Sequence, residues 1–175
     1  MGWKAVTDHY RIEHIVQMVA GDMHIGSAYI GDIIVVKPDG TIVKRPEKTS
    51  NTNLLRYQQE IDADPIMFER LLSKTDVFPT SRTVYTWDEN GIVRTSCDKT
   101  GWPNITHDGI LMHDNRYSTD IMQVAEWARL DAEAMIRHHG DALLDAEKKA
   151  DRARLDLAIS RAMLARLDAN HPRSD

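Results

Sequence analysis

Residues 132–167 read AEAMIRHHGDALLDAEKKADRARLDLAISRAMLARL, and apolar or small side chains recur along this stretch in two rows. Members of the first row are seven residues apart, and members of the second row follow three residues behind them. The first row is Ile136, Leu143, Ala150, Leu157 and Leu164, and the second is His139, Ala146, Ala153, Ser160 and Leu167. Such a repeat is typical of a helix that packs against another helix. These ten residues are called the seam below.

The seam belongs to a longer helical pattern, which begins after Ser118 and continues to His171-Pro172. Ser118 is a suitable N-cap residue, and proline cannot continue a helix. One helix of about 50 residues is about 75 Å long. Gly140 could instead end one helix and start another, which would give a helical hairpin. Because the register runs unbroken through Gly140, a continuous helix is favoured. We expect two parts, a body at residues 1–117 and an arm at residues 118–175.

A body of this size cannot cover a helix of about 75 Å along one side, so much of the seam needs another helix. The second row is mostly small, which permits a partner helix to approach closely. The sequence therefore predicts a homo-oligomer, most simply a dimer, formed through the seam.

The body has the signals of a small antiparallel sheet. Residues 33–36 and 41–43 are β-branched runs on either side of Pro38-Asp39-Gly40, a tight turn, and this pattern predicts a hairpin. Residues 82–87 and 92–95 predict a second hairpin around residues 88–91. For residues 10–19, the β-branched content favours a strand, although a helix also fits the spacing.

Two short helices are expected between the hairpins. Residues 53–61 form the first, and Asp64-Pro65 opens the second with a capping carboxylate and a residue that has no N–H to leave unpaired. The predicted fold class is therefore α+β: a small antiparallel β-sheet body with two short helices, followed by a long C-terminal helix or helical hairpin that resembles a coiled coil.

Composition excludes some functions and leaves others open. The 175 residues contain no apolar run long enough for a membrane span, and the one cysteine, Cys97, has no internal disulfide partner. The first residues lack a signal-peptide pattern, so we expect a cytoplasmic protein. The net charge of −5 includes no concentrated basic stripe, which makes nucleic acid an unlikely partner. No nucleotide-binding glycine loop is found, and no cofactor or metal is expected.

Chemically rich residues are densest between Cys97 and Tyr117. Two pairs, His107-Asp108 and His113-Asp114, could bind a divalent metal or transfer a proton, but a loop does not guarantee that they converge. The structural interpretation is that Asp and Asn side chains bond nearby backbone and that Gly101 and Gly109 adopt special backbone angles. A third interpretation is a binding surface, for which the candidates are Trp102, Asn104, Asn115 and Tyr117. Cys97 fits a small buried residue better than a nucleophile.

Several short motifs resemble those of small phage and prophage accessory proteins, which end in a similar Ala-rich charged helix. The matching stretches are residues 14–17 (HIVQ), 25–30 (IGSAYI), 56–58 (RYQ), 84–87 (VYTW), 101–104 (GWPN) and 106–109 (THDG), with Met112 and Asn115. This resemblance implies a bacterial host cell under phage control, where small non-enzymatic proteins bind and disable host machinery.

Three functional hypotheses follow from these observations. The first is a phage-type accessory protein that associates through its arm and contacts or inhibits a host protein complex, for example a defence system. The second is a metal-dependent hydrolase that uses His107, Asp108, His113 and Asp114. The third is an oligomeric binder of a small ligand such as a nucleotide, with pockets lined by Trp102 or Tyr117.

Overall fold

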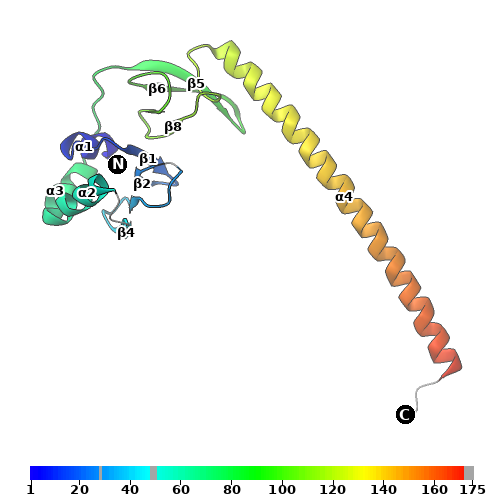
Figure 1. Ribbon diagram of the computed structural model, residues 1–175. Coiled ribbons are helices and arrows are strands. Elements are labelled where there is room, and N and C mark those ends of the chain that lie inside the picture. The colour runs from blue at the N-terminus through cyan, green and yellow to red at the C-terminus, as the bar shows by residue number, and fades with distance from the viewer. Residues whose placement is uncertain (28, 48–50, 172–175) are drawn as a thin grey trace. The chain divides into compact units, whose positions relative to one another are not determined.

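The computed structural model describes residues 1–27, 29–47 and 51–171, which form two compact units, Met1–Ala128 and Arg129–Asp175. The first unit contains the strands and the short helices α1 to α3, and the second contains most of the long helix α4 (Figure 1). The predicted α+β class is confirmed.

The N-terminal sheet is antiparallel, with strand order β1-β2-β3-β4. Its strands are β1 (Ile15–Val19), β2 (Asp22–Gly26), β3 (Ile34–Val36) and β4 (Ile42–Lys44). The predicted hairpin between β3 and β4 is confirmed: Asp39 Oδ1 accepts the N–H of Thr41 at 2.9 Å, and Gly40 has a φ of +86°. The predicted strand in residues 10–19 is confirmed for its second half.

The sequence analysis missed one helix, α1 (Trp3–His9). With seven residues it is too short to show a helical period, and it depends on tertiary packing because Trp3 and Val6 are buried. The two predicted helices are confirmed as α2 (Thr52–Ala63) and α3 (Pro65–Leu72). Asp64 caps α3 as expected, since its Oδ1 accepts the N–H of Met67 at 2.9 Å.

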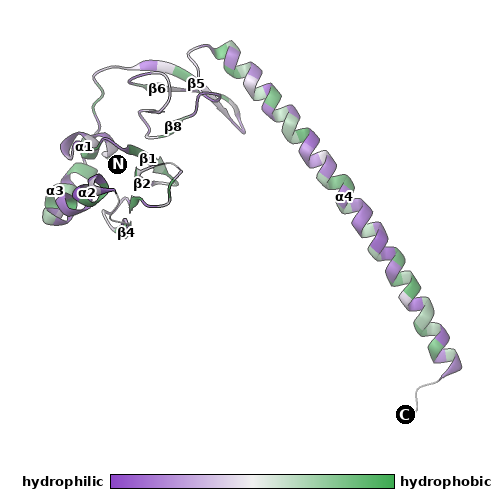
Figure 2. Ribbon diagram, viewed as in Figure 1, coloured by the Kyte–Doolittle hydropathy of each residue, from purple (hydrophilic) through white to green (hydrophobic). Residues whose placement is uncertain are grey.

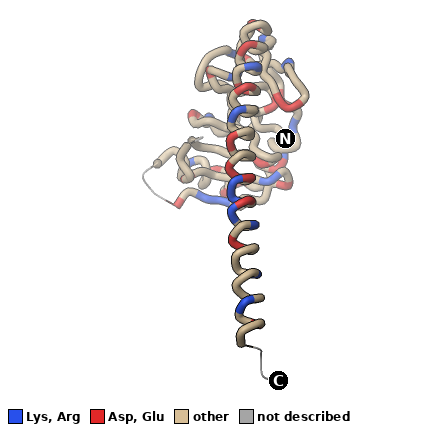
Figure 3. The backbone as a smooth tube through the Cα atoms, turned by 90° about the vertical axis from the view of Figure 1, so that its right-hand side faces the viewer, with Lys and Arg blue, Asp and Glu red and all other residues tan. Residues whose placement is uncertain are grey.

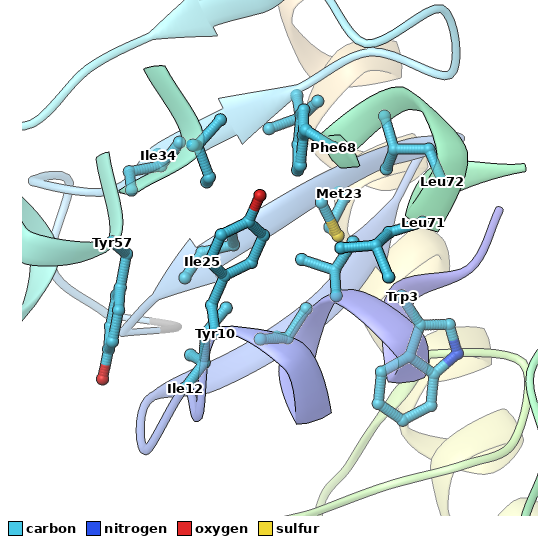
Figure 4. Packing of buried hydrophobic residues seen from close by; sticks show 14 of the residues in the cluster. Trp3, Tyr10, Ile12, Met23, Ile25, Ile34, Tyr57, Phe68, Leu71 and Leu72 are labelled. Carbon is cyan, nitrogen blue, oxygen red and sulfur yellow. The ribbon is translucent and has the colours of Figure 1, made fainter. Parts of the chain in front are cut away.

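The main core of the body lies between the N-terminal sheet and helices α1, α2 and α3. Figure 4 shows Tyr10, Met23, Ile25, Phe68 and Leu72 packed together there. The core therefore joins segments that are far apart in the sequence, which gives the N-terminal part of the body a fixed shape.

The rest of the body consists of two small sheets. The second predicted hairpin is confirmed as β5 (Arg82–Asp88) with β6 (Gly91–Cys97), and β7 (Asn104–Ile105) pairs with β8 (Leu111–Met112). Val84, Cys97 and Met112 form a small core with Tyr117 packed against it.

Helix α4 (Ile121–Asn170) is continuous through Gly140, so the favoured alternative is confirmed and the hairpin is not formed. The helix begins two residues later than predicted. Ser118 pairs with Tyr85 in a β-bridge, and Asp120 caps the helix instead, accepting the N–H of Met122 at 2.8 Å. The first unit extends to Ala128 because Val124, in the first turns of α4, is fully buried.

Polar and apolar residues alternate along α4 (Figure 2). No helix within residues 1–27, 29–47 and 51–171 combines the length and apolarity that are needed to cross a membrane.

Candidate functional site

The loop at residues 106–110 is attached firmly to the body. Thr106 is almost fully buried, and its hydroxyl accepts the N–H of Ile110 at 3.0 Å. The carbonyl of Gly109 accepts the N–H of Met18, in β1, at 2.7 Å. Gly109 has a φ of +82°, and a Cβ at this position would overlap the side chain of Met18. This part of the loop is therefore a structural connection between β1 and the β7–β8 sheet.

His107 is held by contacts from three directions. Its Nε2 lies 3.2 Å from Asp98 Oδ1, and its ring stacks on Phe78 with centroids 3.8 Å apart. Its carbonyl accepts the indole N–H of Trp3 at 3.1 Å. Thr80 in turn donates its hydroxyl to the backbone carbonyl of Asp98 at 3.1 Å. These contacts tie α1, the segment before β5 and the end of β6 together, which explains the conformation of His107 without a ligand.

His113 has different neighbours. Its ring stacks on Trp102, with centroids 5.0 Å apart and an interplanar angle of 22°. Trp102 also contacts the ring of Tyr29, with centroids 6.3 Å apart. Trp102 is 38% exposed and Tyr29 is 75% exposed. Tyr29, Trp102 and His113 are called the aromatic surface below. The Trp102 ring reaches solvent, so this binding-surface candidate is accessible to a partner.

A surface cavity of about 430 Å³ adjoins His113. Arg116 and Tyr117 line it together with apolar side chains that include Met18 of β1 and Leu111 of β8. Arg116 lies over the ring of Trp87 at 4.7 Å and donates to the carbonyl of Trp87 at 3.2 Å, so its guanidinium is held in place. Burial raises the pKa of the Tyr117 hydroxyl above its ordinary value, and the nearby Thr86 side chain opposes this. The phenol therefore stays protonated at neutral pH.

The structure brings some of the predicted site residues together and separates others. Trp102 and Tyr117 both border His113, whereas Asn115 and Asp114 are exposed in the turn that follows. Asn104 lies in β7, where its Oδ1 accepts the N–H of Ile105 at 2.9 Å and its Nδ2 is buried with no hydrogen-bond partner among the described residues. Asn104 and Asn115 are thus not part of the aromatic surface.

The two His-Asp pairs do not form one constellation. Asp108 accepts the hydroxyl of Thr95 at 3.0 Å, and His107 pairs with Asp98 instead of its sequence neighbour. Within the described parts of the chain, no group of three or more His, Cys, Asp or Glu side chains is arranged to hold a metal ion. The hydrolase hypothesis therefore lacks an assembled set of ligands from which a mechanism can be argued.

Cys97 is fully buried, as the sequence analysis favoured. Burial and the nearby carboxylate of Asp98 raise the pKa of its thiol, and Arg82 opposes them only in part. A buried thiol with a raised pKa is a poor nucleophile.

Sequence reasoning missed the residues that hold the loop, namely Trp3, Phe78, Thr80 and Asp98, and it missed Arg116 in the cavity. Their types are ordinary, and they are remote in sequence from the residues that they contact. One signal in the sequence could have identified Tyr29, because it lies in residues 25–30, one of the motifs that resemble phage accessory proteins.

No protein-family model, no curated protein and no solved structure matches this chain. The fold and the two candidate surfaces, on the body and on α4, are therefore the basis for a functional argument.

Proposed function

We propose that the chain is a binding protein that self-associates through the seam of α4 and uses its body to contact a host protein. The observation that carries this proposal is the exposure of the seam. Ile136 is 72% exposed, Leu143 is 62% exposed and Leu157 is 51% exposed. Monomeric proteins seldom leave a long apolar stripe in water, and burial of a leucine is worth roughly 1.5–3 kcal/mol. A second copy of the helix is the simplest cover for a seam with this repeat.

The aromatic surface supports the second half of the proposal. Protein interfaces are enriched in Trp and Tyr, which contribute much of the binding energy when a partner desolvates them. Tyr29 and Trp102 are exposed, and the ring of His113 stacks on the ring of Trp102. The resemblance to phage accessory proteins suggests a bacterial host protein or complex as the partner, for example one that serves in defence against phage.

A small-ligand binder is the second candidate, and the cavity beside His113 favours it. Tyr117 and Arg116 could contact a ring and an anionic group of a ligand such as a nucleotide. A shift of the melting temperature with added nucleotide, lost in Arg116→Ala, would support this candidate over the first.

The proposal is tested by affinity capture from a bacterial lysate with the full-length chain as bait and mass spectrometry as readout. Trp102→Ala should lose the captured protein, because the substitution removes the central ring of the aromatic surface. Ile66→Ala is the matched control, since Ile66 is an exposed apolar residue in α3 and lies outside this surface. Equal capture by both variants would refute the role of the aromatic surface.

A further inference from the structure

Large apolar side chains lie towards the ends of the seam, and small side chains lie in its middle. Charged residues flank this middle part. Every residue from Arg129 to His171 is exposed within its unit, and Figure 3 shows acidic and basic residues interspersed along α4. Glu147 directly follows Ala146 of the seam, and Lys149 directly precedes Ala150, so the two charges lie on opposite sides of the seam. In a two-helix pair these flanking positions face the flanking positions of the partner.

We propose that two copies of α4 pair antiparallel, with the two-fold axis at the level between Asp151 and Arg152. This inference rests on the proposed self-association and adds the orientation and the register of the partner helix. Two independent features of α4 support it. One is the size of the side chains along the seam, and the other is the charge of the residues that flank the seam.

The first feature is that this register places large side chains opposite small ones in the middle layers of the seam, while the end layers pair Ile136 with the partner's Leu167 and His139 with the partner's Leu164. Leu143 meets the partner's Ser160, and Leu157 meets the partner's Ala146. At the centre, Ala150 meets the partner's Ala153, so the two helices can approach closely there. A parallel pair in register would instead stack each residue on its own copy, with Leu143 against the partner's Leu143 and a gap at every alanine or serine layer.

The second feature is that the same register pairs opposite charges on both flanks near the two-fold axis, although Glu133 faces the partner's Asp168 towards the ends. Glu147 faces the partner's Arg154, and Lys149 faces the partner's Asp156; the two-fold axis repeats both pairs. Within the described residues, neither Glu147 nor Lys149 has an ion-pair partner on its own helix, while Arg154 and Asp156 have only exposed partners, Asp151 and Arg152. Pairing across the seam therefore gives two unpaired charges a partner.

Neighbouring alignments keep only one kind of opposite-charge contact, Glu133 or Glu147 with the partner's Arg161, and they add like-charge contacts at the centre. A shift by one seven-residue repeat in one direction places Glu147 and Lys149 opposite their own copies. A shift in the other direction does the same to Arg154 and Asp156. In a parallel pair Lys149 faces the partner's Arg154, a like-charge contact that offsets the one opposite-charge contact, Asp156 with the partner's Arg161. Like charges at flanking positions disfavour an alignment, so the charges select the antiparallel register.

The orientation is tested by pulsed electron paramagnetic resonance on the full chain with Cys97→Ala, carrying a spin label at Ala165→Cys. The antiparallel register predicts a separation of about 40 Å or more between the two labels, because Ala165 lies opposite the partner's His138. A parallel pair predicts about 20 Å. A label at Asp151→Cys is the control, since it predicts about 20 Å in both orientations and shows that the labelled sample is paired.

The register is tested by charge reversal with the dimer dissociation constant as readout. Glu147→Lys alone and Arg154→Glu alone should each weaken the dimer about tenfold, and the double variant should restore it because the charges are again opposite. In a parallel pair Arg154→Glu would instead tighten the dimer, since it removes the contact with Lys149. A wild-type monomer would refute the proposed self-association itself. A dimer with a short Ala165 separation, or without rescue in the double variant, would refute only the antiparallel register.

Discussion

The ring of His107 lies nearly parallel to the ring of Phe78, with the two centroids 3.8 Å apart and an interplanar angle of 10°. Phe78 comes before β5 and His107 comes after β7, so the stack connects segments that the chain does not join directly. The neighbouring carboxylate of Asp98 contacts the edge of the same imidazole. His107 is thus a packing residue of the body, in contrast to His113, which supports an exposed ring.

We therefore expect His107→Ala to lower the free energy of unfolding by about 1–3 kcal/mol, because it removes both the stack and the contact with Asp98. His113→Ala, the matched control, should change it by only about 0.5 kcal/mol, because His113 is exposed. Chemical denaturation of both variants measures the difference. If purified protein carried one equivalent of metal that disappeared in a His107→Ala, His113→Ala double variant, a metal site would replace the structural account.

Gly109 and Gly101 offer a second matched pair. Both have a positive φ, +82° and +99°, so alanine is strained at either position by about 1 kcal/mol. Only at Gly109 does a Cβ also meet another residue, Met18, whereas nothing lies within 4 Å at Gly101. Gly109→Ala should therefore cost about 1–3 kcal/mol more than Gly101→Ala in the free energy of unfolding. Equal costs would mean that the loop moves freely away from β1.

Gly140 tests the continuity of α4. A Cβ at Gly140 meets nothing within 4 Å, and the residue lies inside the helix. Gly140→Ala should therefore stabilise α4 by about 0.5–1 kcal/mol, seen as a higher melting temperature of the helical signal in circular dichroism. If α4 were a hairpin that turns at Gly140, the same substitution would destabilise it, because alanine would disfavour the turn.

The thiol of Cys97 should be protected in the folded protein. Burial and Asp98 raise its pKa, so the reactive thiolate is scarcer at any given pH than for an ordinary cysteine, and the sulfur is fully covered. We expect an alkylating reagent at pH 8 to modify Cys97 only at denaturant concentrations that unfold the body. Rapid modification under native conditions would show that the small core of Val84, Cys97 and Met112 opens readily.

Local signals in the sequence were sufficient for most elements of the fold. The turn at Asp39-Gly40, the cap at Asp64 and the register through Gly140 each depend on residues a few positions apart, and each was predicted. Helix α1 and the partners of His107 could not be found in this way. They depend on contacts between segments remote in sequence, such as Trp3 with His107 and Phe78 with His107, and no spacing pattern encodes such contacts.

The candidate site was predicted in part for the same reason. The 97–117 segment was singled out by its residue types, and Trp102 and Tyr117 do lie next to His113. That His107 is half-buried while His113 is exposed, however, depends on where Phe78 and Met18 lie, because the loop is attached to the body through Gly109 and His107.

Self-association through the seam can be tested by substituting two adjacent leucines, Leu143 and Leu144. Leu143 lies in the seam, while Leu144 lies on another face of α4 and is 55% exposed. Leu143→Asp should dissociate the protein, because it places a charge in the proposed interface. Leu144→Asp should leave association unchanged, although it lowers the helix propensity of α4 by the same amount as Leu143→Asp.

Sedimentation velocity of the wild-type chain at micromolar concentration, alongside these two variants, is the most direct measurement. We expect the mass of two chains for the wild type and for Leu144→Asp, and the mass of one chain for Leu143→Asp. A wild-type mass of one chain across that concentration range, or equal behaviour of the two variants, would contradict self-association through the seam.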